Sequence, residues 1–332
     1  MPVIWLFAAC SNDFEVTSEW KEIPVVYAML SPTDSAHYVR IEKGFLDPDK
    51  GATEIARIAD SLYYPESAIR VFLVRVKTGE RMPMTRVDGD KEGIARKSGI
   101  FANSPNWLYK LRNNGKVISG ESYRLEIDRA DGKPKVTART QIPADIRFIT
   151  PSPAQDPRII SFKDTVGADF QWRADTFGLY NNLTLKIKYK ELDAQGNLLS
   201  RKTINWQPVV NLRRTNIAGP SFVVRTILPQ SRFFKLLSDS IPPVTSGVFR
   251  SFEPGEIVVE SGGYEIGQLQ DVLATAGGLT GAEVIPNYSN ISEGYGIFTS
   301  KNIYSLGNVK ISPETVITMN KNSLTRPLGF SN

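Results

Sequence analysis

The fold class follows from residues 123–140, which read YRLEIDRADGKPKVTART. In the first half, Tyr123, Leu125 and Ile127 alternate with charged residues, which is typical of a strand with one buried and one solvated face. The Asp-Gly pair at 131–132 has the chemistry of a tight hairpin turn, and residues 136–140 return as a second strand. The segment therefore predicts an antiparallel hairpin.

The same pattern recurs on both sides of this hairpin. Residues 23–41 read as strand, turn and strand, with Pro and Asp in the turn, and residues 69–77 are apolar on both faces near their middle. Downstream, residues 183–190 alternate apolar side chains with lysines, and a Gln-Gly-Asn turn precedes another strand near residue 204. Strands at this spacing predict a mainly β protein built of antiparallel β-sandwiches of the immunoglobulin-like or fibronectin-like type.

The length of 332 residues favours two domains over a single core. Prolines crowd the middle of the chain, at positions 143, 151, 153 and 157, where they favour extended connecting chain. We therefore expect an N-terminal β-sandwich over 23–145 and a C-terminal β-rich domain over 146–332. Two helical stretches are expected in the second domain, at 230–237 and 266–276, and the latter has one apolar face and is followed by two glycines.

The N-terminal residues resemble a targeting signal. An apolar run over 4–9 ends on two alanines and Cys10, the one cysteine of the chain, and this resembles a bacterial lipobox. Residues 1–10 would be a lipoprotein signal segment, short enough for its start to lie upstream, with Cys10 lipidated and 11–22 a polar tether. The alternative is a short buried strand with an inert thiol. No later apolar stretch approaches the ~20 residues of a membrane helix, so attachment is expected through Cys10.

The inventory of reactive side chains is small. A single histidine, His37, stands at the head of a predicted strand, and with one cysteine no zinc site or Cys-His pair can be assembled. No nucleophile elbow and no nucleotide-binding glycine loop occurs. We therefore expect no catalytic residues and no cofactor, although hydrolysis by a pair of carboxylates stays open because acids are plentiful. The net charge of +5 is spread among acids without a basic stripe, so no nucleic-acid partner is expected.

Two weaker patterns mark candidate sites. Asp88, Asp90 and Glu92 imitate the first half of a calcium loop, but Gly99 stands where that loop needs a bidentate acid, and a hairpin turn accounts for the same residues. Four tripeptides of Asp, Ser or Thr, and an aliphatic residue resemble the O-glycosylation site of secreted Bacteroidota proteins. Their acceptors would be Ser35, Ser61, Thr165 and Ser240, but ordinary turn and cap chemistry explains them as well.

Residues 279–298 carry the most specific motif, LTGAEVIPNYSNISEGYGIF. It resembles the closing motif of a family of uncharacterised Bacteroidota-type outer-membrane lipoproteins, known as a domain of unknown function. Residues 25–27 with 38–40 resemble the opening strands of that family, and residues 60–64 a later stretch. The resemblance implies a lipid anchor and β-rich domains, often encoded beside outer-membrane transport proteins, and brings no established reaction. Gly294 and Gly296 permit tight backbone and Asn290 can hydrogen-bond a turn, so a rigid structural loop and a ligand contact are both open.

These observations lead to one expectation for function and two rivals. We expect a lipoprotein of the outer membrane, facing the cell exterior, that acts as a binding or accessory module for another envelope protein or a transport system and is not an enzyme. Tyr63, Tyr64, Trp107 and Arg112 are the residue types that partner contacts favour. The rivals are a carboxylate-dependent hydrolase of surface glycans and a structural spacer. The acidic tether after Cys10 favours surface display, with the inward-facing alternative open.

Overall fold

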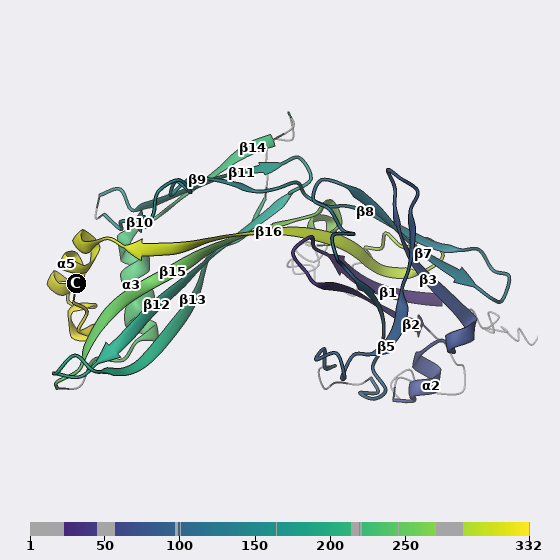
Figure 1. Ribbon diagram of the computed structural model, residues 1–332, viewed down its shortest axis with the longest axis horizontal. Helices are drawn as coiled ribbons and strands as arrows, with labels where there is room; N and C mark the ends of the chain where they lie inside the picture. Colours follow the sequence, from purple (N-terminus) through teal and green to yellow (C-terminus); the bar gives the residue numbers. More distant parts are fainter. Residues whose placement is uncertain are drawn as a thin grey trace, which may run out of the picture.

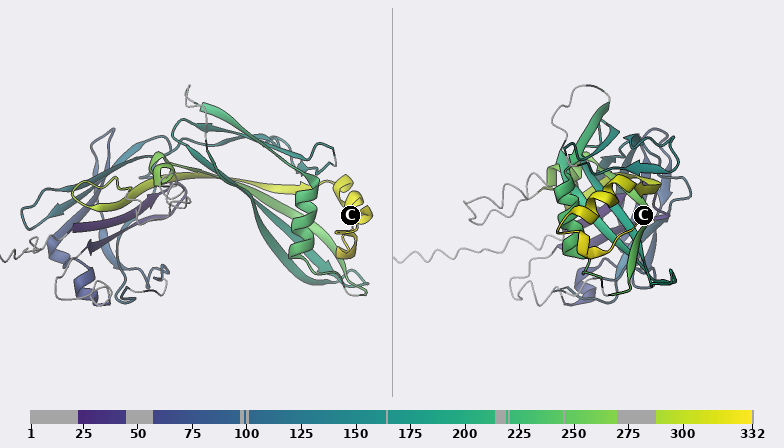
Figure 2. Two further views of the ribbon diagram at one scale, coloured as in Figure 1. Left: turned by 180° about the vertical axis from the view of Figure 1, so that it is seen from behind. Right: turned by 90° about the vertical axis from the view of Figure 1, so that its left-hand side faces the viewer.

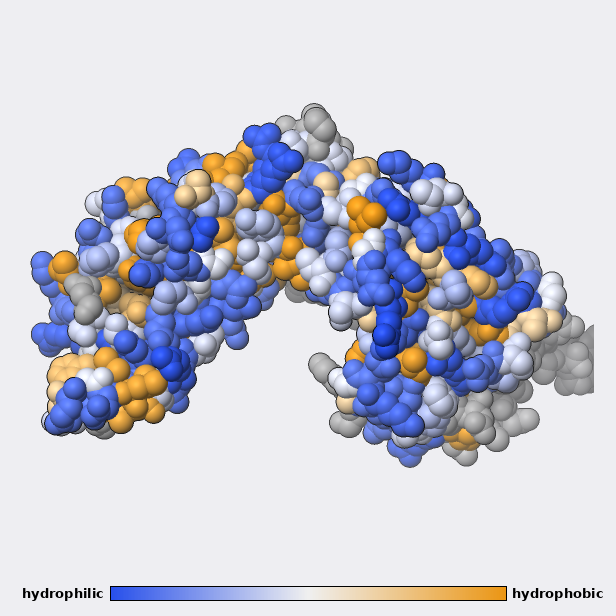
Figure 3. All heavy atoms as spheres, viewed as in Figure 1, coloured by the Kyte–Doolittle hydropathy of each residue, from blue (hydrophilic) through white to orange (hydrophobic). Residues whose placement is uncertain are grey.

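The computed structural model describes residues 23–44, 57–96, 99, 101–163, 165–213, 219, 221–244, 246–269 and 288–331. The molecule is mainly β, with few helices, and forms two lobes joined in an arch (Figure 1). A hollow separates the lobes on one side of the arch (Figure 3). The mainly β fold class predicted from the sequence is confirmed.

The first lobe is a β-sandwich. Its strands are β1 (Ile23–Leu30), β2 (Ala36–Gly44), β3 (Ile69–Arg75), β4 (Arg81–Pro83), β5 (Thr85–Asp88), β6 (Trp107–Arg112), β7 (Ser122–Arg129) and β8 (Val136–Gln141), with the short helices α2 (Ala59–Leu62) and η1 (Glu66–Ala68). One sheet has the order β1-β2-β6-β5 and the other β4-β3-β7-β8. Alternate apolar residues of both sheets, among them Val26, Leu73 and Tyr123, are buried between them.

The second lobe packs a long twisted sheet against a smaller sheet and helices. Its elements are β9 (Arg147–Thr150), β10 (Arg158–Ile160), β11 (Ala168–Asp175), β12 (Tyr180–Leu192), β13 (Leu198–Arg213), β14 (Ser221–Leu228), β15 (Phe249–Gly262), β16 (Tyr295–Ile311), α3 (Gln230–Ser240), α5 (Pro313–Lys321) and η2 (Arg326–Leu328). The smaller sheet has the order β14-β11-β9. Helix α3 contributes Phe233, which stacks on Phe162 with 3.9 Å between ring centroids. Helix α5 and the C-terminus lie at the end of the second lobe far from the first (Figure 2).

Strand β16 belongs to both lobes. Its first part runs parallel to β1, with Val25 opposite Tyr295 and Leu30 opposite Ser300, and its later part pairs antiparallel with β15. The β1-β2-β6-β5 sheet of the first lobe and the long sheet of the second lobe are therefore parts of one sheet of nine strands, which β16 joins (Figure 1). The lobes are joined by a continuous hydrogen-bonded ladder in addition to the chain between β8 and β9.

The glycines of the closing motif allow β16 to approach β1. Gly296 has a φ of +117°, and a Cβ placed there would lie 1.9 Å from the carbonyl oxygen of Val26. A Cβ on Gly294 would lie 2.5 Å from the carbonyl oxygen of Pro24. The Asn290 amide donates to the carbonyl oxygens of Arg139 at 3.1 Å and Phe298 at 2.7 Å, and its oxygen accepts from the Phe298 N–H at 2.9 Å. In the described part of the motif, these residues therefore have a structural role.

The residues of the two hydrophobic cores differ in one place from the domain ranges expected from the sequence. Ile142 lies in the first core and Ile146 in the second, so the change of lobe occurs in the proline-rich region, as expected. Ile291 and Phe298, however, lie in the first core, although they were assigned to the domain over 146–332. The reason is the parallel β1–β16 pairing, which also makes the sheet mixed and not wholly antiparallel. Residues 264–269 are helical, and the remainder of the helix expected over 266–276 lies outside the described residues.

Candidate functional site

The candidate site is an apolar surface on the outer side of the first lobe. Strand β1 buries Val26, Ala28 and Leu30 and turns its alternate side chains outward. Tyr27 lies opposite Ile297, and Val25 lies opposite Tyr295, so side chains of β1 and β16 share this outer side. We call the surface made by Val25, Tyr27, Met29, Tyr295 and Ile297 the tyrosine face. Its two tyrosines are 50 % and 52 % exposed, which is unusual for aromatic side chains in the middle of a sheet.

A shallow, open pocket of about 390 Å³ adjoins the tyrosine face. Tyr27, Met29 and Ile297 line it on one side, and Tyr38, Arg40 and Leu108 line it on the other. The strand register explains this arrangement, because Tyr27 is also opposite Arg40 of β2. The pocket is therefore apolar towards β16 and polar towards β2.

A hydrogen-bonded network fixes the polar side of this pocket. Arg40 donates to Glu42 at 3.3 Å and to the Asn106 side chain at 2.8 Å, and Arg96 donates to Glu42 at 2.6 Å and to the Tyr63 hydroxyl at 3.0 Å. Glu42 and Asn106 are buried. Because a buried carboxylate is costly without partners, these contacts hold the loop before β6 firmly onto β2.

The residues of the calcium-like loop bind different partners within the protein. The Asp90 carboxylate accepts from the Asn106 amide at 3.1 Å, while that of Glu92 accepts from the Tyr38 hydroxyl at 3.0 Å and from Lys110. The hydrogen bonds from Lys110 and then Tyr38 lower the pKa of Glu92. Asp88 accepts from the Asp90 N–H at 3.2 Å, as in an Asx-type turn. Within the described ranges, no group of three or more His, Cys, Asp or Glu side chains could hold a metal ion.

His37 is a buried strand residue. It is 1 % exposed, and neither ring nitrogen has a hydrogen-bond partner. Burial lowers the pKa of His37, with Asp34 and Asn113 opposing this effect. The ring therefore favours its uncharged form, and neither of its nitrogens is hydrogen-bonded to a group that it could activate.

Glu265 is the one acid among the described residues whose pKa is raised. Burial raises it, and the hydrogen bond from Thr140 opposes the rise. The Thr140 hydroxyl donates to its carboxyl at 2.7 Å. A glycosidase-type pair would need a second acid facing the first, and the hydrogen-bonding neighbours of Glu265 are hydroxyl groups.

The sequence-based choice of partner-binding residues is wrong for two of the four. Tyr63 and Tyr64 are buried, Trp107 is half-buried beneath the guanidinium of Arg86, and Arg112 is exposed. Tyr27 in β1 and Tyr295 in β16 are exposed instead, as is Tyr264 in the helical segment that follows β15. They were missed because β1 reads IPVVYAML, which is apolar on both faces and gives no sign of which face is outward.

The proposed modification sites have different surroundings. Ser35 and Thr165 lie exposed in turns, Ser240 lies exposed at the end of α3, and Ser61 is half-buried in α2. Cys10 lies outside the described residues. Glycosylation of these hydroxyls and lipidation of Cys10 both stay predictions.

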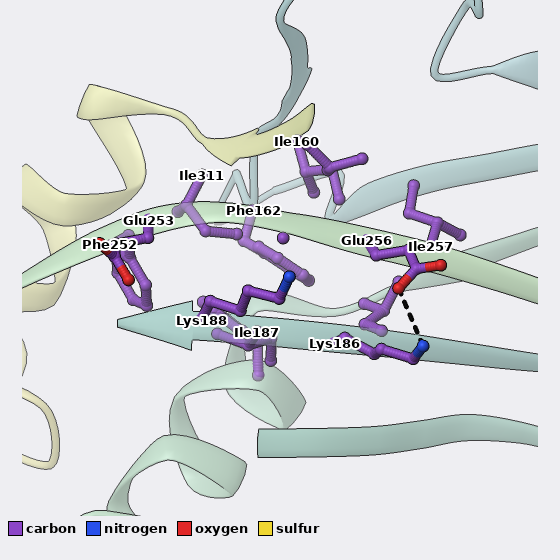
Figure 4. A pocket seen from close by; sticks show the side chains of 14 residues that line it. Ile160, Phe162, Lys186, Ile187, Lys188, Phe252, Glu253, Glu256, Ile257 and Ile311 are labelled. Atoms are coloured by element: carbon purple, nitrogen blue, oxygen red, sulfur yellow. Dashed lines mark hydrogen bonds and ion pairs between the residues drawn. The ribbon is translucent and has the colours of Figure 1, made fainter. Parts of the chain in front are cut away.

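A second cavity, in the second lobe, is too small for a ligand. Its volume is about 20 Å³, which is room for roughly one water molecule. It lies beside the irregular pairing of β12 and β15, between apolar side chains such as Ile160 and Phe162 and the ion pair of Lys186 with Glu256 at 2.8 Å (Figure 4). Gly255 is required there, because a Cβ would lie 2.3 Å from the Lys186 carbonyl oxygen. This cavity is a packing feature of the bulge.

Comparisons with known proteins do not identify a family. No family model matches the chain, and no curated protein matches it. Among solved structures, the chain has a weak similarity to the calcium binding domain CBD12 of CALX1.1, at 8 % identity over 86 % of this chain and 99 % of that chain, with a TM-score of 0.13. A TM-score this low supports no conclusion. In the described part of the chain, no helix has the length and apolar character needed to cross a membrane.

Proposed function

We propose that this protein is a binding or accessory module of the bacterial outer membrane, anchored through Cys10, facing the exterior and contacting another envelope protein through the tyrosine face. The observation that carries the proposal is the pair of half-exposed tyrosines on adjacent strands, beside an open pocket. Tyr and Arg side chains are enriched among residues that dominate binding energy at protein interfaces.

Rigidity of the tyrosine face supports this proposal. Tyr27 and Tyr295 lie on paired strands; Gly296 lets β16 approach β1 closely, and the Asn290 hydrogen bonds fix the start of β16 beside β8. A side chain that is ordered before binding loses less conformational entropy when a partner docks. Exposed aromatic and aliphatic side chains bordered by a fixed polar network also match the usual arrangement of an apolar interface centre with a polar rim.

The rival hydrolase has less support. Glu265, the described acid whose pKa is raised by burial, is 8 % exposed, lies at the junction of the lobes and is not among the residues that line the open pocket. Of the acids in the network beside that pocket, Glu42 is paired with Arg96 and Asp90 accepts from the Asn106 amide. Binding needs none of these groups to react.

The proposal is tested by affinity capture from detergent-solubilised membranes. The Tyr27→Ala/Tyr295→Ala protein should lose a partner that the wild-type protein captures, whereas Phe249→Ala should retain it. Phe249 is a suitable control because it is a similarly exposed aromatic residue, 48 % exposed, on β15 in the second lobe. The captured protein is then purified and its Kd measured against each variant. Equal affinity of the double variant and the control would remove the tyrosine face from the proposal, and turnover of a glycan panel would favour the hydrolase.

A further inference from the structure

Four buried polar residues meet where the two lobes join. Glu265 follows β15, Thr140 is on β8, and Thr299 and Ser300 are on β16; all four are 8 % exposed or less. The Thr140 hydroxyl donates to the Glu265 carboxyl at 2.7 Å and lies 3.1 Å from the Ser300 hydroxyl, which donates to the Gln141 carbonyl oxygen at 2.7 Å. These contacts connect one segment of each lobe with the strand that both lobes share.

The segment that carries Glu265 is held at a short distance from β16. The Gly263 N–H donates to the Ser300 carbonyl oxygen at 2.7 Å. A Cβ on Gly263 would lie 2.7 Å from the Ser300 hydroxyl and 3.3 Å from the Glu265 carboxyl, so glycine leaves room for that carboxyl. The Thr299 hydroxyl is buried near the Glu265 carboxyl and has no hydrogen-bond partner.

No described cation neutralises this carboxyl. On β16, the Lys301 ammonium is paired with Glu260 at 2.9 Å, and on β8 the Arg139 side chain is exposed to solvent. The titratable groups that do act near Glu265 are the phenols of Tyr288 and Tyr264; burial, then the charge of Glu265 and Tyr264, raises the pKa of Tyr288 to about 12. An ionised Glu265 would therefore be a buried charge among hydroxyl groups, which is costly in a protein interior.

We propose that Glu265 is a proton-dependent clasp between the lobes. In its neutral form, the carboxyl can stay buried, and residues 263–269 lie against β8 and β16 with the hydrogen bond from Thr140 as one of the contacts. When the carboxyl ionises, its solvation draws this segment away from β16 and opens the junction. Thr299 also lines the pocket beside the tyrosine face, so the clasp would regulate that pocket. This last consequence rests on the proposed function, whereas the clasp itself does not.

Hydrogen exchange followed by mass spectrometry tests the clasp on the full chain. Exchange of residues 263–269 and 299–301, divided by the intrinsic rate at each pH, should be at least tenfold faster at pH 8.5 than at pH 4.5 in the wild-type protein. In Glu265→Gln, which imitates the neutral carboxyl, the two normalised rates should be equal. A peptide over 183–189 of β12, remote from Glu265 in the second lobe, should be unaffected by pH and serves as the control.

Two further variants keep the test decisive if Glu265→Gln folds poorly. Thr140→Val removes the hydroxyl without changing charge and should speed exchange at pH 4.5 but not at pH 8.5, where the clasp is already open. Thr140→Ser should restore slow exchange at pH 4.5. The clasp is refuted by equal normalised rates at both pH values in the wild-type protein, or by the same pH dependence in Glu265→Gln. Loss or retention of partner capture by the tyrosine variants has no influence on these rates, so the two proposals fail separately.

Discussion

We expect that replacement of Gly296 by alanine weakens the pairing of β16 with β1, which joins the two lobes. The backbone there has a φ of +117°, which costs an L-residue of order 1–3 kcal/mol. The new Cβ also has to move from 1.9 Å to at least 3.0 Å from the Val26 carbonyl oxygen, which pushes β16 away from β1. Losing one or two of the ladder hydrogen bonds costs about 1 kcal/mol each. The expected loss of stability is therefore about 2–5 kcal/mol, a large part of the ~5–15 kcal/mol of a typical domain.

Gly307→Ala is the matched control for this prediction. Gly307 lies on the same strand, β16, and no atom lies within 4 Å of a Cβ placed there. Its replacement should change stability by no more than about 0.5 kcal/mol. Urea unfolding is followed by tryptophan fluorescence, and hydrogen exchange of β1 and β2 reports where stability is lost.

The expected result is a lower unfolding midpoint for Gly296→Ala, with faster exchange in β1. Equal midpoints for the two alanine variants would refute the argument that close approach of β16 holds the first lobe together. A loss confined to β12 and β13 would also refute it, because those strands do not contact Gly296.

Asn290→Ala removes two hydrogen bonds that the amide donates, to Arg139 and Phe298, and one that its oxygen accepts from Phe298. The free energy of unfolding in urea should fall by about 2–4 kcal/mol. An unchanged unfolding midpoint would contradict the structural role of the motif. The pKa of His37 is lowered from 6.5, so the unfolded chain binds more protons below that pH; wild-type stability should fall as pH drops below 6.5, and His37→Leu should lack this fall. The pKa of Glu265 is raised from 4.5, so wild-type stability should decline as pH rises above 4.5, and a Glu265→Gln protein with the same decline would contradict this. Cys10→Ala should leave soluble protein or uncleaved precursor, and unchanged membrane fractionation would argue against lipidation.

Elements with local patterns could be predicted well from the sequence. The strand expected over 23–30 is β1 with the same bounds, and the 123–140 hairpin is the β7–β8 pair. The helix expected over 230–237 is α3, since its buried side chains recur at helical spacing. Each of these depends on neighbouring residues, which determine which face is apolar and where the chain turns.

The site and the bridge could not be predicted because both depend on contacts between distant parts of the chain. Pairing of Tyr27 with Ile297 joins residues far apart in sequence, and no local pattern encodes a parallel register. Tyr63 and Tyr64 are ordinary candidates for exposed aromatics by composition, but the packing of α2 buries them. The environment of Glu265 was likewise invisible, since its partner Thr140 lies on another lobe's strand.

The shared strand also determines when the first lobe can be completed during biosynthesis. Its core contains Phe298, and its sheet ends on β16, so a ribosome must deliver about 300 residues before the first lobe closes. Until then, β1 presents an unpaired edge and the sandwich lacks part of its apolar filling, a state open to misassociation. N-terminal fragments that end before β16 should therefore be poor folding units.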